Sequence, residues 1–183
     1  AYLLIPLVAV MGLSPVLVRI PMLLASLATL PGIYVVTRRI FGPGVALMAT
    51  FMLAISPWHV LLSRWALDSN LFPFVFLAAF WLLLLIRQNG WWFVPACLGM
   101  AMSLYAYGTA YVVVPTFMAG ALLLISRATF LRKMQLWSGL AAFASLAFPI
   151  GLLIIVNRLG WDSIRLGPLT VPHFPVPVRW ETT

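Results

Sequence analysis

Charged side chains are scarce in this chain, and acidic ones are almost absent. Only 8% of the 183 residues are charged, against about 25% in soluble domains. The acids are Asp68, Asp162 and Glu181. Hydrophobic residues make up 64% of the chain, and the mean hydropathy is +1.10. These values lie far outside the soluble range, so we expect an integral membrane protein.

The excess of basic residues does not indicate a nucleic-acid partner. The eleven Lys and Arg residues give a net charge of +8, but they are scattered between apolar runs. This placement is typical of topology signals at the ends of membrane spans. We therefore expect membrane lipid around the chain and no nucleic acid.

Cysteine and the common catalytic motifs are also missing. Cys97 is the single cysteine, so no intrachain disulfide can form. The sequence contains no P-loop, zinc-ligand spacing, GxGxxG or GxSxG motif. It indicates no cofactor and no metal site, and it leaves the need for a divalent metal unknown.

Long apolar runs, separated by Gly, Pro and basic residues, fill most of the chain. We expect an all-α integral membrane protein, a polytopic bundle with about six transmembrane helices. The runs cover 15–37, 45–55, 71–86, 91–105, 112–125 and 135–156. Residues 1–12 are too few to span and should lie at the membrane surface. Four prolines between 168 and 177 predict an extended, Pro-rich outer loop.

The distribution of basic residues predicts the orientation. One set of short connections holds Arg38, Arg39, Arg87, Arg127, Arg132 and Lys133, whereas the opposite set holds Arg64 and Asp68. By the positive-inside rule the Arg38 side is cytoplasmic. The connections 55–70 and 105–111 and the tail from Arg158 should then face outward together from a plasma membrane.

The ends of the sequence suggest an internal fragment. Ala1 is not a start methionine, no charged segment precedes an apolar leader, and RWETT closes the chain without a terminal element. We expect residues 1–158 to be part of a transmembrane domain and residues 159–183 to begin an extracytoplasmic loop. Alone, such a fragment should be inactive.

The polar stretch 55–70, ISPWHVLLSRWALDSN, gathers His59, Arg64 and Asp68 between two apolar runs. A charge at bilayer depth costs about 2.5–3.5 kcal/mol, so these residues should be interfacial, paired or in a wet cavity. In a helix, Arg64 and Asp68 would share one face and could both point at a ligand. An ordinary interfacial ion pair explains the spacing equally well.

Tyrosines mark a second polar stretch, at Tyr105, Tyr107 and Tyr111. They could stack on a sugar or a prenyl chain, although interfacial tyrosines more often act as membrane anchors.

Several short motifs follow one another along the chain in a characteristic order. It comprises Arg19 near an outer helix start, the basic-FG turn from Arg39 to Gly42, SPWH at 56–59, and Ser63-Arg64 followed by Asp68. The segments 103–115 and 148–172 continue the pattern. This arrangement resembles bacterial membrane glycosyltransferases of the dolichyl-phosphate-mannose protein mannosyltransferase-like family. One departure is Tyr111, where similar sequences often carry arginine.

The resemblance implies an enzyme that transfers a sugar from a polyprenyl-phosphate donor to an acceptor on the outer face of the membrane. Arg64, Arg19 and His59 would supply cations for the leaving phosphate. Asp68 would stabilise positive charge on the sugar, hold Arg64 or bind a sugar hydroxyl. Family members carry the acid taken as the catalytic base in an earlier outer loop, which these 183 residues do not include.

Two other classes also fit a multi-pass chain with few charges. A transporter or lipid-linked-sugar flippase subunit would place ionisable residues at mid-span and often show inverted repeats, neither of which is evident here. In a structural membrane subunit, Arg64 and Asp68 would form only an ion pair.

Overall fold

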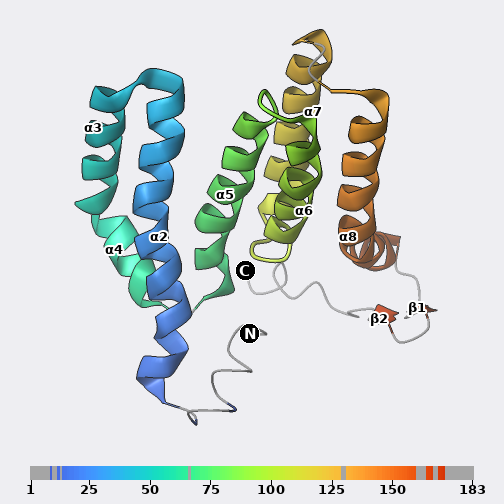
Figure 1. The fold of residues 1–183 in the computed structure, drawn as a ribbon. Helices are drawn as coiled ribbons and strands as arrows, with labels where there is room; N and C mark the ends of the chain where they lie inside the picture. Colours follow the sequence, from blue (N-terminus) through green and yellow to red (C-terminus); the bar gives the residue numbers. More distant parts are fainter. Residues whose placement is uncertain are drawn as a thin grey trace.

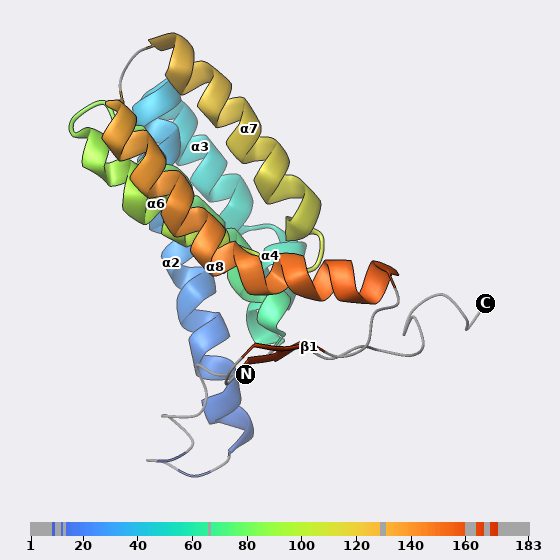
Figure 2. The same ribbon diagram turned by 90° about the vertical axis from the view of Figure 1, so that its right-hand side faces the viewer.

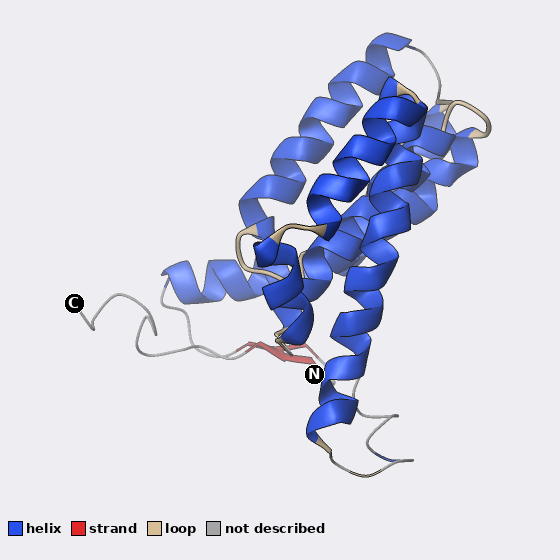
Figure 3. Ribbon diagram, turned by 90° about the vertical axis from the view of Figure 1, so that its left-hand side faces the viewer, coloured by secondary structure: helices blue, strands red, loops and turns tan. Residues whose placement is uncertain are grey.

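The structure is a computed structural model and describes residues 9, 12, 14–65, 67–128, 131–159, 164–166 and 169–171. Almost all of this part is helical, with one small hairpin (Figure 3). The longer helices are α2 (Pro15–Phe41), α3 (Pro43–Ala54), α5 (Phe72–Leu85), α6 (Phe93–Ser103), α7 (Ala110–Ala128) and α8 (Lys133–Leu159). The shorter elements are α4 (Pro57–Arg64), the 3-10 helices η2 (Asp68–Leu71) and η3 (Gly90–Trp92), and the strands β1 (Ile164–Leu166) and β2 (Leu169–Val171).

The longer helices stand side by side and alternate in direction along the chain (Figure 1). Helix α6 packs between α5 and α8, while α2 packs against α3 and α5. The core surrounds α6, where Phe93, Cys97 and Met100 are fully buried. One end of this bundle carries α4, η2 and the hairpin, and the other carries the α2–α3 turn and the start of α8 (Figure 1).

Local signals set the two ends of α2. The Ser14 hydroxyl accepts a hydrogen bond from the Leu17 N–H at 3.2 Å, and Pro15 opens the first turn. Gly42 ends the helix with φ at 91°, a conformation that favours glycine. The helix continues past residue 37, the predicted end, because Arg38 and Arg39 suit the negative end of a helix dipole.

The prediction of about six transmembrane helices is not supported. Among the described residues, two segments are long and apolar enough to cross a membrane, Leu17–Phe41 and Lys133–Asn157. A third results if α3 and α4, bent by 57°, form one broken span. Four of the helices, α2, α3, α7 and α8, are longer than the predicted runs, whereas α5 and α6 are shorter. The run 91–105, for example, loses both ends to η3 and to the 104–109 connection.

Two segments that the sequence predicts to be outer ones differ from their predicted form. The stretch 55–70, expected as a loop, contains α4, which Pro57 opens as a first-turn proline. The tail, expected to be extended, contains an antiparallel hairpin in which Ile164 pairs with Val171. The prolines from 172 onward lie outside the described residues.

Large apolar side chains cover the outside of the bundle. Val112 and Leu124 are each 70% exposed, and Leu47 is 62% exposed. Apolar surface that stays exposed to water costs about 25 cal/mol of free energy per Å². Contact with lipid removes this cost. Together with the apolar helices, this surface identifies a helical membrane protein.

Gly139 allows the close contact between α8 and α6, and replacing it by alanine should destabilise the protein by about 1–3 kcal/mol through overpacking. The new Cβ would overlap the Phe93 ring and lie 3.3 Å from Cys97 Sγ. Gly151 is the matched control on α8, because a Cβ there has no neighbour within 4 Å. Thermal unfolding in detergent should show a lower Tm for Gly139→Ala than for Gly151→Ala. Equal values would contradict this α6–α8 contact.

Candidate functional site

The structure brings two of the predicted cations together. Arg19, in the second turn of α2, and Arg64, the last residue of α4, line one hollow of about 380 Å³. Its remaining lining residues are Ile20, Leu23 and Ser63. Both arginines are exposed. The lining surface is almost entirely apolar, so the two arginines border the hollow mainly with their hydrocarbon stems. Two arginine side chains beside apolar ones suit an anion with a hydrophobic attachment.

Helix α4 is placed by its packing against α2. It is only eight residues long, too short to be stable alone in water, so its position depends on neighbours. Pro57 redirects the chain after α3, and Trp65 leaves helical geometry with φ −95° and ψ 125°. These two breaks confine the helix to the segment that presents Ser63 and Arg64 to α2.

Asn70 fastens the end of α4, a role that the sequence reasoning missed. Its side-chain Nδ2 donates hydrogen bonds of 2.7 Å to the carbonyls of Leu62 and Trp65. Leu62 belongs to the final turn of α4 and its carbonyl also accepts the Trp65 N–H at 3.2 Å, whereas Trp65 directly follows the helix. Carbonyls at a helix end lack the donors of a helix interior, and the Asn70 amide supplies one to each of these two. Asn70 is buried. The amide therefore holds the backbone on both sides of Arg64, and a polar residue shortly after a predicted helix end is the only sequence signal for it.

Replacing Asn70 by alanine should lower the stability of the protein by about 1–3 kcal/mol, because the carbonyls of Leu62 and Trp65 each lose the hydrogen bond that the Asn70 amide donates. Asn70→Asp should be more damaging, since a carboxylate cannot donate to those carbonyls. Asn89 is the matched control. Its Oδ1 also caps backbone, by accepting a hydrogen bond from the Trp91 N–H, but the residue is exposed. Thermal unfolding in detergent should rank wild type and Asn89→Ala above Asn70→Ala and Asn70→Asp. A Tm for Asn70→Asp equal to that of wild type would be inconsistent with the clamp.

His59 lies next to the hollow but does not line it. It is half-buried on α4, one turn before Ser63. Residues four apart share a helix face, so His59 extends the polar face of α4 that Ser63 begins. The structure thus places His59 one helical turn from Ser63, which lines the hollow.

Asp68 is near in the chain but not on the same helix as Arg64. Its backbone starts η2, which packs against α2, and its side chain lies outside the described part of the structure. The condition under which Arg64 and Asp68 would share a helix face is not met, because the backbone is extended at Trp65 and again at Leu67. The turn held by Asn70 separates the two residues instead.

The tyrosines pack at the same end of the bundle but not in the hollow. The Tyr107 ring lies 6.2 Å from the Phe72 ring, centroid to centroid, directly after η2. The Tyr105 hydroxyl donates to the Leu146 carbonyl at 2.7 Å. Burial and the neighbouring Tyr111 raise the pKa of Tyr105, so this hydroxyl keeps its proton at neutral pH. Tyr111 is exposed at the start of α7.

The hydrogen bond from the Tyr105 hydroxyl to the Leu146 carbonyl meets α8 close to the bend of that helix. Leu146 lies three residues before Pro149, and Figure 2 shows that α8 changes direction in this part. Proline removes a backbone donor and kinks a helix, so nearby carbonyls need other partners. Tyr105 is therefore a structural tie between the 104–109 connection and α8.

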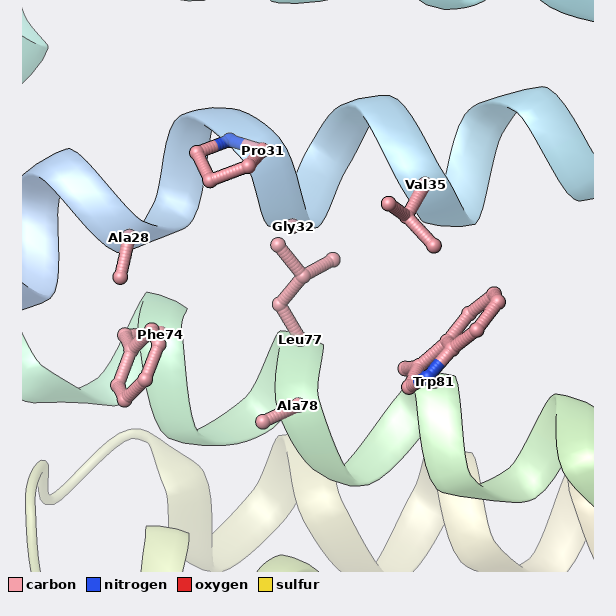
Figure 4. Close-up of a pocket in the computed structure, with 8 residues that line it drawn as sticks. All are labelled: Ala28, Pro31, Gly32, Val35, Phe74, Leu77, Ala78 and Trp81. Atoms are coloured by element: carbon pink, nitrogen blue, oxygen red, sulfur yellow. The ribbon is translucent and has the colours of Figure 1, made fainter.

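A second, apolar pocket of about 270 Å³ lies between α2 and α5. Pro31, Gly32 and Val35 face Phe74, Leu77 and Trp81 across it (Figure 4). Leu77 approaches so closely that a Cβ on Gly32 would lie 2.9 Å from its Cδ2. This pocket offers hydrocarbon contacts on the same helix that carries Arg19.

The comparison with protein families matches the chain to a known model. The model for dolichyl-phosphate-mannose-protein mannosyltransferase covers residues 1–153. The chain belongs to this family. It has no significant match among curated proteins or solved structures. Membership of the mannosyltransferase family indicates a membrane glycosyltransferase.

The matched range contains every site residue predicted from the sequence and ends within α8. The mannosyltransferase model therefore includes the hollow, η2 and the tyrosines but not the β1–β2 hairpin. Within the part of the chain that the structure describes, no three His, Cys, Asp or Glu side chains gather as a metal-binding group would require.

Proposed function

We propose that this chain forms the donor-binding part of an enzyme that transfers a sugar from a polyprenyl-phosphate carrier to an acceptor on the outer face of the membrane. The observation that carries the proposal is the shared hollow of Arg19 and Arg64. A polyprenyl-phosphate sugar combines an anionic phosphate with a long hydrocarbon chain. The hollow offers two arginines to the phosphate. The apolar pocket on α2 suits part of the hydrocarbon chain.

In the proposed reaction, the bond between the anomeric carbon of the sugar and the carrier phosphate oxygen breaks. The phosphate leaves with the electron pair, and the acceptor oxygen bonds to the anomeric carbon while losing its proton to a base. Arg19 and Arg64 stabilise the growing charge on the phosphate, with His59 beside them. Asp68 stabilises the positive charge that develops on the sugar. The acceptor is a hydroxyl-bearing protein, lipid or polysaccharide.

Transfer can be measured with membranes that contain the complete protein and a radiolabelled polyprenyl-phosphate sugar. Label should pass from the lipid fraction to the acceptor fraction, and membranes with an Arg19→Ala, Arg64→Ala double variant should lose this transfer. Movement of intact labelled lipid between leaflets without transfer would support a flippase and overturn the proposal.

We also propose that the end of the bundle that carries Arg64 faces outward. Cysteines introduced at Gly108 and at Gln88 should then differ in intact cells: an impermeant thiol reagent should label Gly108→Cys and spare Gln88→Cys. Both positions are exposed, and the native Cys97 is buried, so background labelling should be low. The reverse pattern would place the hollow on the cytoplasmic face.

A further inference from the structure

The end of the bundle opposite the Arg19–Arg64 hollow is strongly basic. Arg38 and Arg39 close α2, Arg87 follows α5, and Arg132 and Lys133 begin α8. All of these helix ends lie together at the top of Figure 1. The acids fall elsewhere in the sequence, Asp68 on η2 and Asp162 and Glu181 after α8. This end should therefore attract anions and repel cations.

Two of these cations already lie over aromatic rings. The Arg38 guanidinium is 6.0 Å from the centre of the Tyr34 ring, and that of Arg39 is 5.8 Å from the Trp81 ring. Arg87 stands at the rim of a cavity.

That cavity, of about 180 Å³, lies between the ends of α5 and α7. Leu83 and Ile86 are buried beneath it, while Leu124 on its wall is 70% exposed. Apart from Arg87, its lining is aliphatic. A basic rim over an aliphatic groove at a helix end matches the order of groups in a phospholipid, phosphate first and acyl chain behind it.

We propose that this groove binds one anionic phospholipid of the surrounding leaflet, with its phosphate at Arg87 and an acyl chain between α5 and α7. The net charge of the headgroup decides between lipids. A zwitterionic lipid offers the same phosphate, but its ammonium group would lie at the basic end of the bundle, beside Arg87. An anionic headgroup such as phosphatidylglycerol carries no such cation. The proposal does not depend on the proposed transferase reaction.

Native mass spectrometry of the complete protein, released from vesicles of equal phosphatidylglycerol and phosphatidylcholine, tests the site. The wild type should retain phosphatidylglycerol in preference to phosphatidylcholine. Arg87→Gln should reduce the retained phosphatidylglycerol several-fold. Leu124→Trp should do the same by filling the groove, and it leaves every cation in place. Both variants should keep the donor KM of the wild type, because they lie at the opposite end from Arg19 and Arg64.

The matched control is Arg38→Gln, which removes the same charge from the same end but outside the groove. Its loss of bound lipid should be much smaller. Equal losses in Arg38→Gln and Arg87→Gln, or full retention in Leu124→Trp, would show a diffuse charge effect and overturn the site. Inorganic phosphate at millimolar concentration should not displace the lipid. Displacement by it would show a simple phosphate site instead.

Discussion

Replacing Arg64 by alanine in the complete protein should weaken use of the polyprenyl-phosphate donor by about 2–4 kcal/mol, or roughly 30- to 1,000-fold in kcat/KM. Arg64 lines the hollow that it shares with Arg19, and it is fixed at the end of a short helix. Removing it would leave the donor phosphate with one guanidinium fewer. Initial rates at varied donor concentration measure the effect.

Lysine at position 64 gives an intermediate test. It keeps the charge but loses the planar fork that binds phosphate through two hydrogen bonds, so Arg64→Lys should fall between wild type and Arg64→Ala. Arg38→Ala is the control, because it removes one arginine from the opposite end of the bundle. An Arg64→Ala enzyme with the donor kinetics of Arg38→Ala would refute the phosphate contact.

Arg19 should be coupled to Arg64. Because both residues line one hollow, their contributions to donor use should not add when both are replaced. Strict additivity would mean that the two arginines act at separate places.

The arginines themselves could be recognised from the sequence, but their convergence could not. Each stands out as a charge next to an apolar run, where burial in lipid is costly. Their meeting depends on α4 folding back against α2, and a short helix carries no local signal for its packing partner. The proline that opens α4 was visible, whereas the direction of the bend was not.

The end of α4 before Asp68 could not be predicted from the sequence for a related reason. Trp65 and Leu67 do not forbid a helix, so local propensity alone permits one. The structure ends it because the buried Asn70 amide binds the carbonyls of Leu62 and Trp65. A tertiary hydrogen bond thus overrides the propensity. Hydropathy likewise located the apolar runs, but it could not show how many residues at their ends enter turns.

Replacing Asp68 by asparagine should lower turnover by about 100-fold or more if its carboxylate stabilises the sugar cation. Asparagine keeps the volume and most hydrogen bonding of the side chain while removing its charge. The donor KM should change much less than kcat, because the charge acts mainly in the transition state. Membrane expression and Tm should stay normal, because asparagine matches aspartate closely in size and shape.

Exchanging the two residues, Arg64→Asp with Asp68→Arg, separates this role from a structural ion pair. An ion pair should survive the exchange in part, because attraction between the two charges is the same in either order. The proposed site should not survive it. Arg64 belongs to α4, beside Arg19, and Asp68 belongs to η2, beyond the turn that Asn70 holds. The exchange would put a carboxylate in the phosphate hollow and a cation where the sugar becomes positive, so both changes oppose the reaction. Near-normal transfer by the exchanged enzyme would leave Arg64 and Asp68 the role of an ion pair alone.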